Sequence, residues 1–264
     1  MSDRLDAALV ERGLARSRTQ AARLIADGFV TVDGRSVVKA SLRVGQETRL
    51  EVTGVDSYVS RAAAKLLAAL DGFSVDPTGR LALDAGASTG GFTQVLLERG
   101  ARRVLAIDVG HGQLDPGIAA DPRVLSREGI NVRTLHRDAL AGITGTAERP
   151  SIVVADLSFI SLRHVLPALR DCADDDADFL VLIKPQFEVG RQGVREGIVR
   201  DAALRAAAIA GVLWAAWDSG LGTVGLLPSP IAGTSGNREY LAHLRATGGR
   251  DPSDWEADIP ALAF

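Results

Sequence analysis

The chain has 264 residues, of which 46 % are hydrophobic and 24 % charged, and its formal net charge is −3. These values suit one large α/β domain with a small appendage, and they exclude extensive disorder and an overall strongly basic nucleic-acid binder. The charge is unevenly placed, because residues 1–53 carry nine Arg or Lys and seven Asp or Glu, which leaves −5 for the remainder. A modestly basic N-terminal module therefore precedes an acidic body.

Cysteine, histidine and apolar runs narrow the class of protein further. Cys172 is the only cysteine, so no disulfide can form within the chain, and the four histidines are scattered, so we expect no metal site. The first residues lack the apolar core of a signal peptide, and the stretch from Ala206 to Trp217 is too short for a membrane helix. We therefore expect a cytoplasmic protein without a membrane partner.

Residues 4–28 predict two helices. Gly13 is a plausible end of the first, and Ser17 is a plausible N-cap of the second, with Gln20 three residues later as in a capping box. Residues 28–35 then predict a strand and a turn, because Asp-Gly is a strong turn signal, and residues 50–52 predict another short strand.

This N-terminal pattern resembles the small RNA-binding domain that ribosomal protein S4, several pseudouridine synthases and tyrosyl-tRNA synthetases share. The resemblance is carried by Ser17-Arg18, Ala21, Leu24-Ile25, Gly28, Val30, Val32, Gly34 and Val44-Gly45. It implies a helix pair on a small sheet, with a basic helix face that grips RNA phosphates. The candidates for that contact are Arg4, Arg16, Arg18, Arg23 and Lys39. The alternative is that these side chains only solvate a helical surface.

Residues 55–60 are the expected linker, and a helix is expected over residues 61–70. After a turn at Pro77 to Gly79, an apolar strand over residues 81–84 ends in an acid, and a glycine-rich turn leads into a helix. A dinucleotide enzyme would place pyrophosphate at such a helix start, but the spacing departs from G-x-G-x-x-G. It fits better the D-x-G-x-x-x-G-G form of class I methyltransferases, whose ligand S-adenosylmethionine has no phosphate.

The expected cofactor-binding residues follow from that resemblance and from the next strand. Residues 103–108 predict a buried strand that ends in Asp108, which lies 24 residues after Asp84. This is near the interval of roughly 20 residues at which such folds place an acid that accepts hydrogen bonds from ribose hydroxyls. Asp138, after residues 132–135, is a third candidate acid, expected near the adenine amino group. Both acids could instead be turn or cap residues. The full set of candidates is Asp84, Gly86, Ala87, Ser88, Thr89, Gly90, Gly91, Phe92, Asp108 and Asp138.

Two further apolar strands end in charged residues. Residues 152–156 end in Asp156, and residues 179–184 end in Lys184, where Pro185 stops the strand. Ligands of open α/β sheets bind outside the carboxyl ends of the strands, so these side chains should meet at that edge. A lysine after five apolar strand residues is hard to explain by solubility alone.

Lys65 and Glu239 complete a larger pattern. The order Lys65, Asp156, Lys184, Glu239 resembles the Lys-Asp-Lys-Glu tetrad of 2′-O-methyltransferases related to the FtsJ heat-shock enzyme. With the RNA-binding domain added, the chain resembles the TlyA family, also known as hemolysins. The resemblance implies a class I Rossmann-like sheet of seven mostly parallel strands. The expected domains are an α+β RNA-binding domain at 1–54, a linker at 55–60 and a methyltransferase domain at 61–264. Taken singly, Lys65 and Glu239 could be surface residues.

The family's activity gives the functional expectation, which is methylation of cytidine 2′-hydroxyls by S-adenosylmethionine in 23S and, in some members, 16S ribosomal RNA of assembled subunits. A ribose hydroxyl must lose its proton as it attacks the methyl group, and a lysine can assist when burial and a second ammonium lower its pKa. Our hypothesis is that Lys184 acts on the hydroxyl with Lys65 nearby, while Asp156 and Glu239 orient the two lysines.

Two alternatives stay open at this point. A ribosome-assembly factor would bind subunits without methyl transfer, and a pore-former would release vesicle contents without the cofactor. One local departure also matters, because some family members have Arg-x-Trp-Val in the linker, whereas this chain has Asp56-Ser57-Tyr58-Val59.

Overall fold

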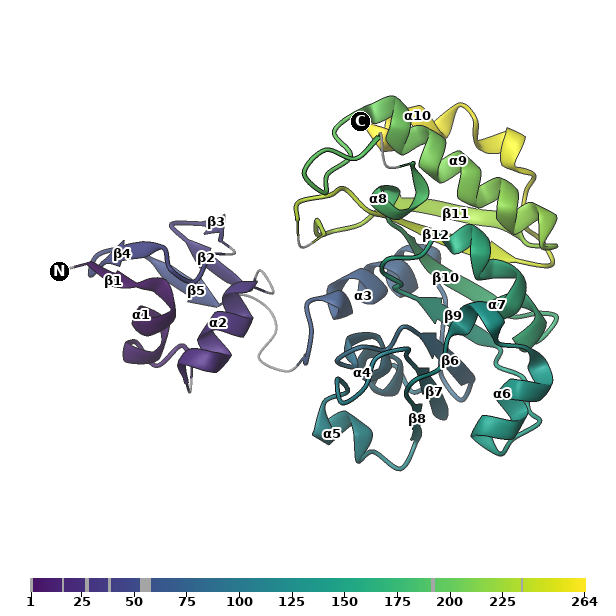
Figure 1. The fold of residues 1–264 in the computed structure, drawn as a ribbon, viewed down its shortest axis with the longest axis horizontal. Coiled ribbons are helices and arrows are strands. Elements are labelled where there is room, and N and C mark those ends of the chain that lie inside the picture. The colour runs from purple at the N-terminus through teal and green to yellow at the C-terminus, as the bar shows by residue number, and fades with distance from the viewer. Residues whose placement is uncertain are drawn as a thin grey trace. The chain divides into compact units, whose positions relative to one another are not determined.

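The computed structural model describes residues 2–15, 17–26, 29–37, 39–52, 58–190, 193–233 and 235–264. The chain divides into two compact units, residues 1–61 and residues 62–264 (Figure 1). Each unit is described by itself.

The N-terminal unit packs two helices against short strands. The helices are α1 (Leu5–Glu11) and α2 (Arg18–Ala26), and the strands pair as β3-β2-β5 (Arg35–Ser36, Val30–Val32, Leu50–Val52) and β1-β4 (Ser2–Arg4, Arg43–Gly45). The predicted helices, the strand–turn unit and the strand at 50–52 are confirmed, whereas β1 and β4 were not predicted. Asp33 and Gly34 have φ of 50° and 77°, as a two-residue hairpin turn requires.

The core of this unit is small. Leu5, Leu9, Ala21, Ile25 and Val30 are fully buried in it. The apolar stripes predicted on the two helices are confirmed, because each stripe packs against the other helix and against β2.

The larger unit is built on a seven-stranded sheet in the order β11-β12-β10-β9-β6-β7-β8. The parallel strands are β6 (Leu81–Ala85), β7 (Arg103–Ile107), β8 (Val124–Arg127), β9 (Ile152–Ala155) and β10 (Asp178–Ile183). The last two strands, β11 (Gly222–Pro228) and β12 (Tyr240–Arg245), pair antiparallel with their neighbours. The predicted seven-stranded, mostly parallel sheet is confirmed.

Helices and short helical turns connect the strands. The longer ones are α3 (Ala62–Phe73), α4 (Gly91–Glu98), α6 (Arg137–Thr144), α7 (Leu166–Cys172) and α9 (Ala202–Asp218). The shorter ones are α5 (Pro116–Ala119), α8 (Pro185–Glu188), α10 (Asp258–Ala263), η1 (Val132–Thr134), η2 (Leu162–His164) and η4 (Pro252–Trp255). Within the described residues, none of the helices is both long and apolar enough to cross a membrane.

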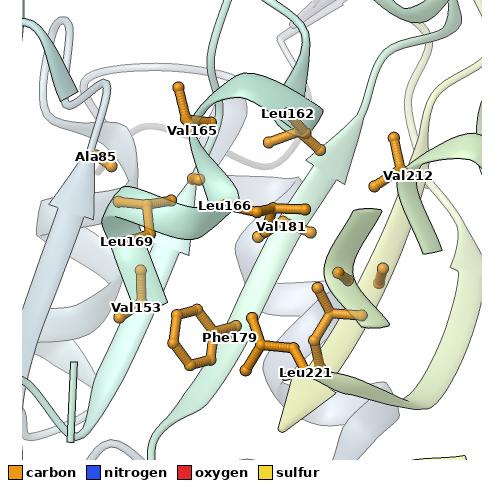
Figure 2. Close-up of a cluster of buried hydrophobic side chains, with 14 of the residues drawn as sticks. Ala85, Val153, Leu162, Val165, Leu166, Leu169, Phe179, Val181, Val212 and Leu221 are labelled. Atoms are coloured by element: carbon orange, nitrogen blue, oxygen red, sulfur yellow. The ribbon is translucent and has the colours of Figure 1, made fainter. Parts of the chain in front are cut away.

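Side chains alternate between the two faces of the sheet along each strand, and their contacts show which helices cover each face. Val153, Phe179 and Val181 belong to one buried cluster with side chains of α7 and α9, as Figure 2 shows. Successive strand residues point to opposite faces, so Asp84, between two members of that cluster, points to the other face, where its carboxylate meets Thr93 of α4. Full burial of one large apolar side chain contributes about 1.5–3 kcal/mol.

The register of the parallel strands sets the position of the site. Ala85 lies opposite Ile107 on one side and opposite Ala155 on the other, and Ala155 lies opposite Val181. The carboxyl ends of β6, β7, β9 and β10 are therefore adjacent, and the segments that follow them share one edge of the sheet (Figure 1).

Candidate active site

The glycine-rich turn between β6 and α4 has a backbone that needs glycine at specific positions. Gly86 has a φ of 88°, and a Cβ atom there would lie 2.8 Å from Leu157 Cδ2 and 3.1 Å from the Asp156 carbonyl oxygen. Gly90, with a φ of 96°, is the N-cap of α4. Glycine thus lets the turn approach the segment after β9 more closely than any other residue would.

Asp108 joins this turn to the end of β7. Its Oδ2 accepts the Ser88 N–H at 2.8 Å, and its Oδ1 accepts the Gly110 N–H at 2.7 Å. Each carboxylate oxygen keeps a further lone pair, so the side chain can still accept hydrogen bonds from a ligand. Asp108 is therefore both a turn residue and an available acceptor.

A cavity of about 550 Å³ opens beside this turn. Among the predicted site residues, Gly86, Ser88, Asp108 and Asp156 line it, and the wall also contains Ile130, Asn131 and Ser158. The volume is within the range of about 300–1,000 Å³ that is usual for small-molecule sites. The cavity is mostly apolar with a few polar groups at one edge of the sheet, which suits a nucleoside-containing ligand.

The other residues of the predicted motif shape the turn without lining the cavity. Ala87 and Phe92 are buried, and Gly90 and Gly91 form the start of α4, next to Thr89. Asp84 is fully buried, and its Oδ2 accepts the Thr93 hydroxyl at 2.6 Å. Burial raises the pKa of Asp84 to about 7, against the opposing effect of the Thr93 hydrogen bond.

Asp84 also has an unpaired atom. Its Oδ1 is buried and lacks a hydrogen-bond partner within the described part of the chain. A buried acceptor without a donor is unusual and calls for an explanation, such as a ligand or a water molecule that supplies the donor. The orphaned acceptor belongs to the strand that leads into the glycine-rich turn, so it is consistent with a ligand or water site near that turn.

The structure does not place Asp138 at the cavity. Asp138 is exposed in the first turn of α6 and is not a lining residue. The chain passes the cavity earlier, at Ile130, Asn131 and Val132, soon after β8 ends at Arg127. The methyltransferase resemblance led us to expect the acid Asp138 near the adenine, whereas the position beside the cavity is occupied by the amide Asn131.

Lys65, Asp156, Lys184 and Glu239 come together at the same edge of the sheet. Lys184 Nζ lies 2.5 Å from Asp156 Oδ1, and Lys65 Nζ lies 3.5 Å from Asp156 Oδ2. Lys65 Nζ also donates to Glu239 Oε2 at 2.7 Å. The four side chains come from α3, the end of β9, the end of β10 and the residue before β12. Lys65 is thereby joined in one chain of ion pairs to Asp156, 91 positions later in the sequence, and to Glu239, 174 positions later.

This cluster is largely removed from water. The exposed fractions of the side chains are 5 % for Lys65, 10 % for Lys184, 12 % for Asp156 and 3 % for Glu239. Burial by itself would raise the pKa of Asp156, but the charges of Lys65 and Lys184 outweigh it and hold that pKa below its ordinary value. Asp156 therefore stays ionised between the two lysines.

The loop before β12 is fitted to Glu239. A Cβ atom on Gly233 would lie 2.5 Å from Glu239 Oε1, so a side chain at this position would displace the carboxylate. Asn237, which is buried, accepts the Val199 N–H at 3.0 Å and donates to the Gly197 carbonyl at 2.7 Å. These contacts hold the loop that presents Glu239 toward Lys65.

Sequence reasoning missed several residues of the site. Ser158 accepts a hydrogen bond from Lys184 Nζ at 3.0 Å, and Gln113 accepts one from Ser88 Oγ at 3.2 Å. Glu188 is buried and binds the Ser161 hydroxyl at 2.5 Å. Phe159 has a φ of 65° and is 92 % exposed at the cavity wall. Ser158 could have been found, because it lies two residues after Asp156, and side chains two residues apart in an extended segment point to the same side.

The candidate RNA contacts of the N-terminal unit are only partly described. Arg4 and Arg18 both lie 3.0 Å from the Asp6 carboxylate, and Lys39 is exposed. Arg16 and the side chain of Arg23 lie outside the described residues, as do residues 55–57 of the expected linker. Their predicted roles stay predictions.

Comparisons with known proteins agree with this geometry. Residues 58–246 match the FtsJ-like methyltransferase family, and residues 3–50 match the S4 domain. The chain is 51 % identical over 246 residues to the 16S/23S rRNA (cytidine-2′-O)-methyltransferase TlyA of Mycobacterium tuberculosis, covering 92 % of this chain and 89 % of the relative. It is 31 % identical to the 23S rRNA (cytidine-2′-O)-methyltransferase TlyA of Campylobacter jejuni, with coverages of 73 % and 79 %. The chain is also similar to a solved structure that carries the name hemolysin, from Streptococcus thermophilus, with a TM-score of 0.76 and 36 % identity over 99 % of this chain and 94 % of the other.

Proposed function

The chain belongs to the TlyA family, which combines an S4 domain with an FtsJ-like methyltransferase domain, and from this premise we propose that it methylates the 2′-hydroxyl of cytidine in ribosomal RNA. The observation that carries the proposal is the buried ion-pair chain in which Asp156 holds Lys65 and Lys184 beside the cavity. We propose 23S rRNA in the assembled large subunit as the substrate, and 16S rRNA as the second one to test.

The proposed methyl donor is S-adenosylmethionine, which supplies a methyl group on a positively charged sulfur. Asp108 would accept hydrogen bonds from its ribose hydroxyls, and Gly86 would let the donor approach the backbone closely. Ile130 and Asn131 would flank the base, in place of the expected Asp138. The unpaired Oδ1 of Asp84 would accept a hydrogen bond from the bound cofactor or from a water molecule held with it.

The proposed chemistry assigns a separate task to each member of the cluster. Lys184 accepts the proton of the ribose hydroxyl in its neutral form, and Asp156 fixes the position of Lys184 through the 2.5 Å contact. Lys65 keeps Asp156 ionised, and Glu239 balances the charge of Lys65 at 2.7 Å. Orientation of the hydroxyl in line with the methyl group supplies much of the rate.

We assign RNA binding to residues 1–54 and methyl transfer to residues 61–264, joined by residues 55–60. Arg4 and Arg18 hold a shared carboxylate while their side chains stay 44 % and 62 % exposed, so their remaining N–H groups can reach phosphates. An enzyme with this substrate would act in the cytoplasm, where ribosomes are assembled.

The test is methyl transfer from labelled S-adenosylmethionine to separately purified, unmodified small and large subunits, followed by mass mapping of the modified nucleotide. A ribose methyl group on cytidine of the large subunit is expected, and the small-subunit arm decides the second substrate. Binding of subunits and cofactor without transfer to either subunit would reject the proposal in favour of an assembly factor.

A further inference from the structure

Lys184 contacts two polar side chains, its ion-pair partner Asp156 and its hydrogen-bond acceptor Ser158. Its Nζ lies 2.5 Å from Asp156 Oδ1 and donates to Ser158 Oγ at 3.0 Å. Asp156 and Ser158 both line the cavity, and Lys184 itself is buried behind them. The tetrad accounts for the ion pair with Asp156 and leaves the hydrogen bond to Ser158 unexplained.

We propose that Ser158 is a positioning residue for the reaction, which sets the orientation of the Lys184 amine toward the ribose hydroxyl. The inference rests on the proposed function. A neutral amine has two N–H groups and one lone pair. When Asp156 and Ser158 accept the two N–H groups, the lone pair is left for the hydroxyl proton. With Asp156 alone, the amine could turn so that an N–H group, not the lone pair, faces the substrate.

The step balances with Lys184 as the proton acceptor. The O–H bond of the ribose breaks and its proton moves to the Lys184 nitrogen. The oxygen forms a bond to the methyl carbon as the carbon–sulfur bond breaks, and the sulfur leaves as a neutral thioether. The resulting ammonium has three N–H groups, and Asp156 and Ser158 still accept two of them. Ser158 therefore supports Lys184 before and after proton transfer.

The shape of the loop does not depend on the Ser158 hydroxyl. The segment after β9 is held by Glu188, which accepts the Ser161 hydroxyl at 2.5 Å and the Leu162 N–H at 2.8 Å. The Ser158 side chain is exposed toward the cavity, and within the described residues Lys184 is its hydrogen-bond partner. Removal of the hydroxyl at 158 should therefore disturb Lys184, whereas its removal at 161 should disturb the loop.

The experiment compares S158A, S158T and the matched control S161A with the full-length wild type. Turnover on large subunits, KM for the subunit, Kd for S-adenosylmethionine and the pH profile of kcat are measured. We expect S158A to lower kcat by about three- to tenfold, the effect of one lost hydrogen bond, with KM and Kd unchanged. S158T keeps a hydroxyl and should restore kcat. The acidic limb of the profile should move in S158A, because a hydrogen bond to the ammonium favours the charged form.

A second readout does not depend on turnover. The chain has only three lysines, Lys39, Lys65 and Lys184, so selectively labelled lysine side chains give a simple NMR spectrum. In S158A the Lys184 signal should shift, with Lys39 as the unmoved reference. Normal wild-type turnover together with an unchanged kcat and an unmoved Lys184 signal in S158A would overturn the role of Ser158 alone. A loss of kcat in S158A that S158T does not restore would overturn it as well. Absence of transfer by the wild type would overturn both this role and the proposed function.

Discussion

The two units of this protein contain the same arrangement of charge in two different environments. In the N-terminal unit, Arg4 and Arg18 share the carboxylate of Asp6, with side chains 44 % and 62 % exposed. In the larger unit, Lys65 and Lys184 share the carboxylate of Asp156, with side chains 5 % and 10 % exposed. The first pair is in contact with solvent, and the second is enclosed by protein.

The difference explains why the cations differ. An exposed arginine stays charged and presents a planar group that matches phosphate, so it suits sequence-independent contact with RNA. A lysine can lose its proton when its surroundings favour the neutral form, so it suits proton transfer. Of the 30 basic residues only three are lysines, and two of these lie in the buried cluster. The comparison predicts that substitutions in the buried cluster lower activity and stability far more than equivalent substitutions around Asp6.

The largest effect is expected for Lys184→Ala. Removal of the proton acceptor should lower kcat by about 10²–10⁴-fold, the usual contribution of general base catalysis. The Kd for S-adenosylmethionine should change little, because Lys184 does not line the cavity. Lys39→Ala, which removes the one exposed lysine, should leave kcat at saturating subunit unchanged. Full turnover by Lys184→Ala with normal cofactor binding would contradict the assignment.

The next effect concerns folding stability. Glu239→Gln removes the charge partner of Lys65 in a buried setting, and breaking a buried pair costs about 3–5 kcal/mol of unfolding free energy. Asp6→Asn removes the shared partner of two arginines that are 44 % and 62 % exposed, and it should cost less, because water can solvate the guanidinium groups that are left. Denaturant unfolding of both variants measures the difference. Similar losses for the two would show that burial does not set the energy of these pairs.

A third effect gives the two units opposite pH dependence. The folded pKa of Asp84 is about 7, above its ordinary value, so the folded state holds a proton that the unfolded state releases. The stability of the larger unit should therefore fall as pH rises from about 4 to about 7. The pKa of Asp6 is lowered to about 2. Its contribution to the stability of the N-terminal unit is therefore complete when the pH is above the ordinary pKa of an aspartate, and it is lost as the pH falls toward 2.

Asp84→Asn isolates the first of these contributions. The variant should be more stable than the wild type at pH 8, by about 2–4 kcal/mol, and nearly equal to it at pH 4. Thermal unfolding at the two pH values measures this. We also expect weaker binding of S-adenosylmethionine if the Asp84 carboxylate supports the site. A stability difference that does not vary with pH would mean that Asp84 is ionised throughout the range.

The smallest effect concerns RNA affinity. Arg4→Ala and Arg18→Ala should each reduce the slope of log affinity against log salt by about 1, because one phosphate contact is lost. Affinity for large subunits at moderate salt should fall severalfold, while kcat at saturating subunit stays the same. Titration of subunit binding at several salt concentrations tests this. An unchanged slope in both variants would assign these arginines to the Asp6 pair alone.

The sequence was most informative where chemistry and topology coincide. Asp108, Asp156 and Lys184 each follow an apolar strand, and parallel strands bring their carboxyl ends to one edge of a sheet, so their placement at that edge could be predicted. Asp84 lies within β6 and points into the interior toward Thr93 instead. Strands β1 and β4 could not be predicted, because each is only three residues long and carries no clear alternation. Short strands are formed by pairing partners that are distant in sequence.

Side-chain contacts within the site were predicted less well. Asp138 was expected near the adenine because methyltransferases often have an acid at this point, but a helical turn at residues 132–134 carries the chain away from the cavity before that residue is reached. Ser158 was assigned no role from the sequence. Its position within 3.0 Å of Lys184 depends on the geometry of two loops that are 26 residues apart.

The most direct test of the central comparison is a reciprocal exchange of the two kinds of cation, Lys184→Arg and Arg18→Lys, with single-turnover methyl transfer and subunit affinity measured for both. An arginine at 184 keeps the positive charge but cannot lose its proton, so we predict that transfer falls about as far as in Lys184→Ala, with cofactor binding retained. Lysine at 18 keeps a phosphate-binding charge, so transfer at saturating subunit should match the wild type. Near-normal transfer by Lys184→Arg would show that Lys184 supplies charge alone, and it would contradict the account.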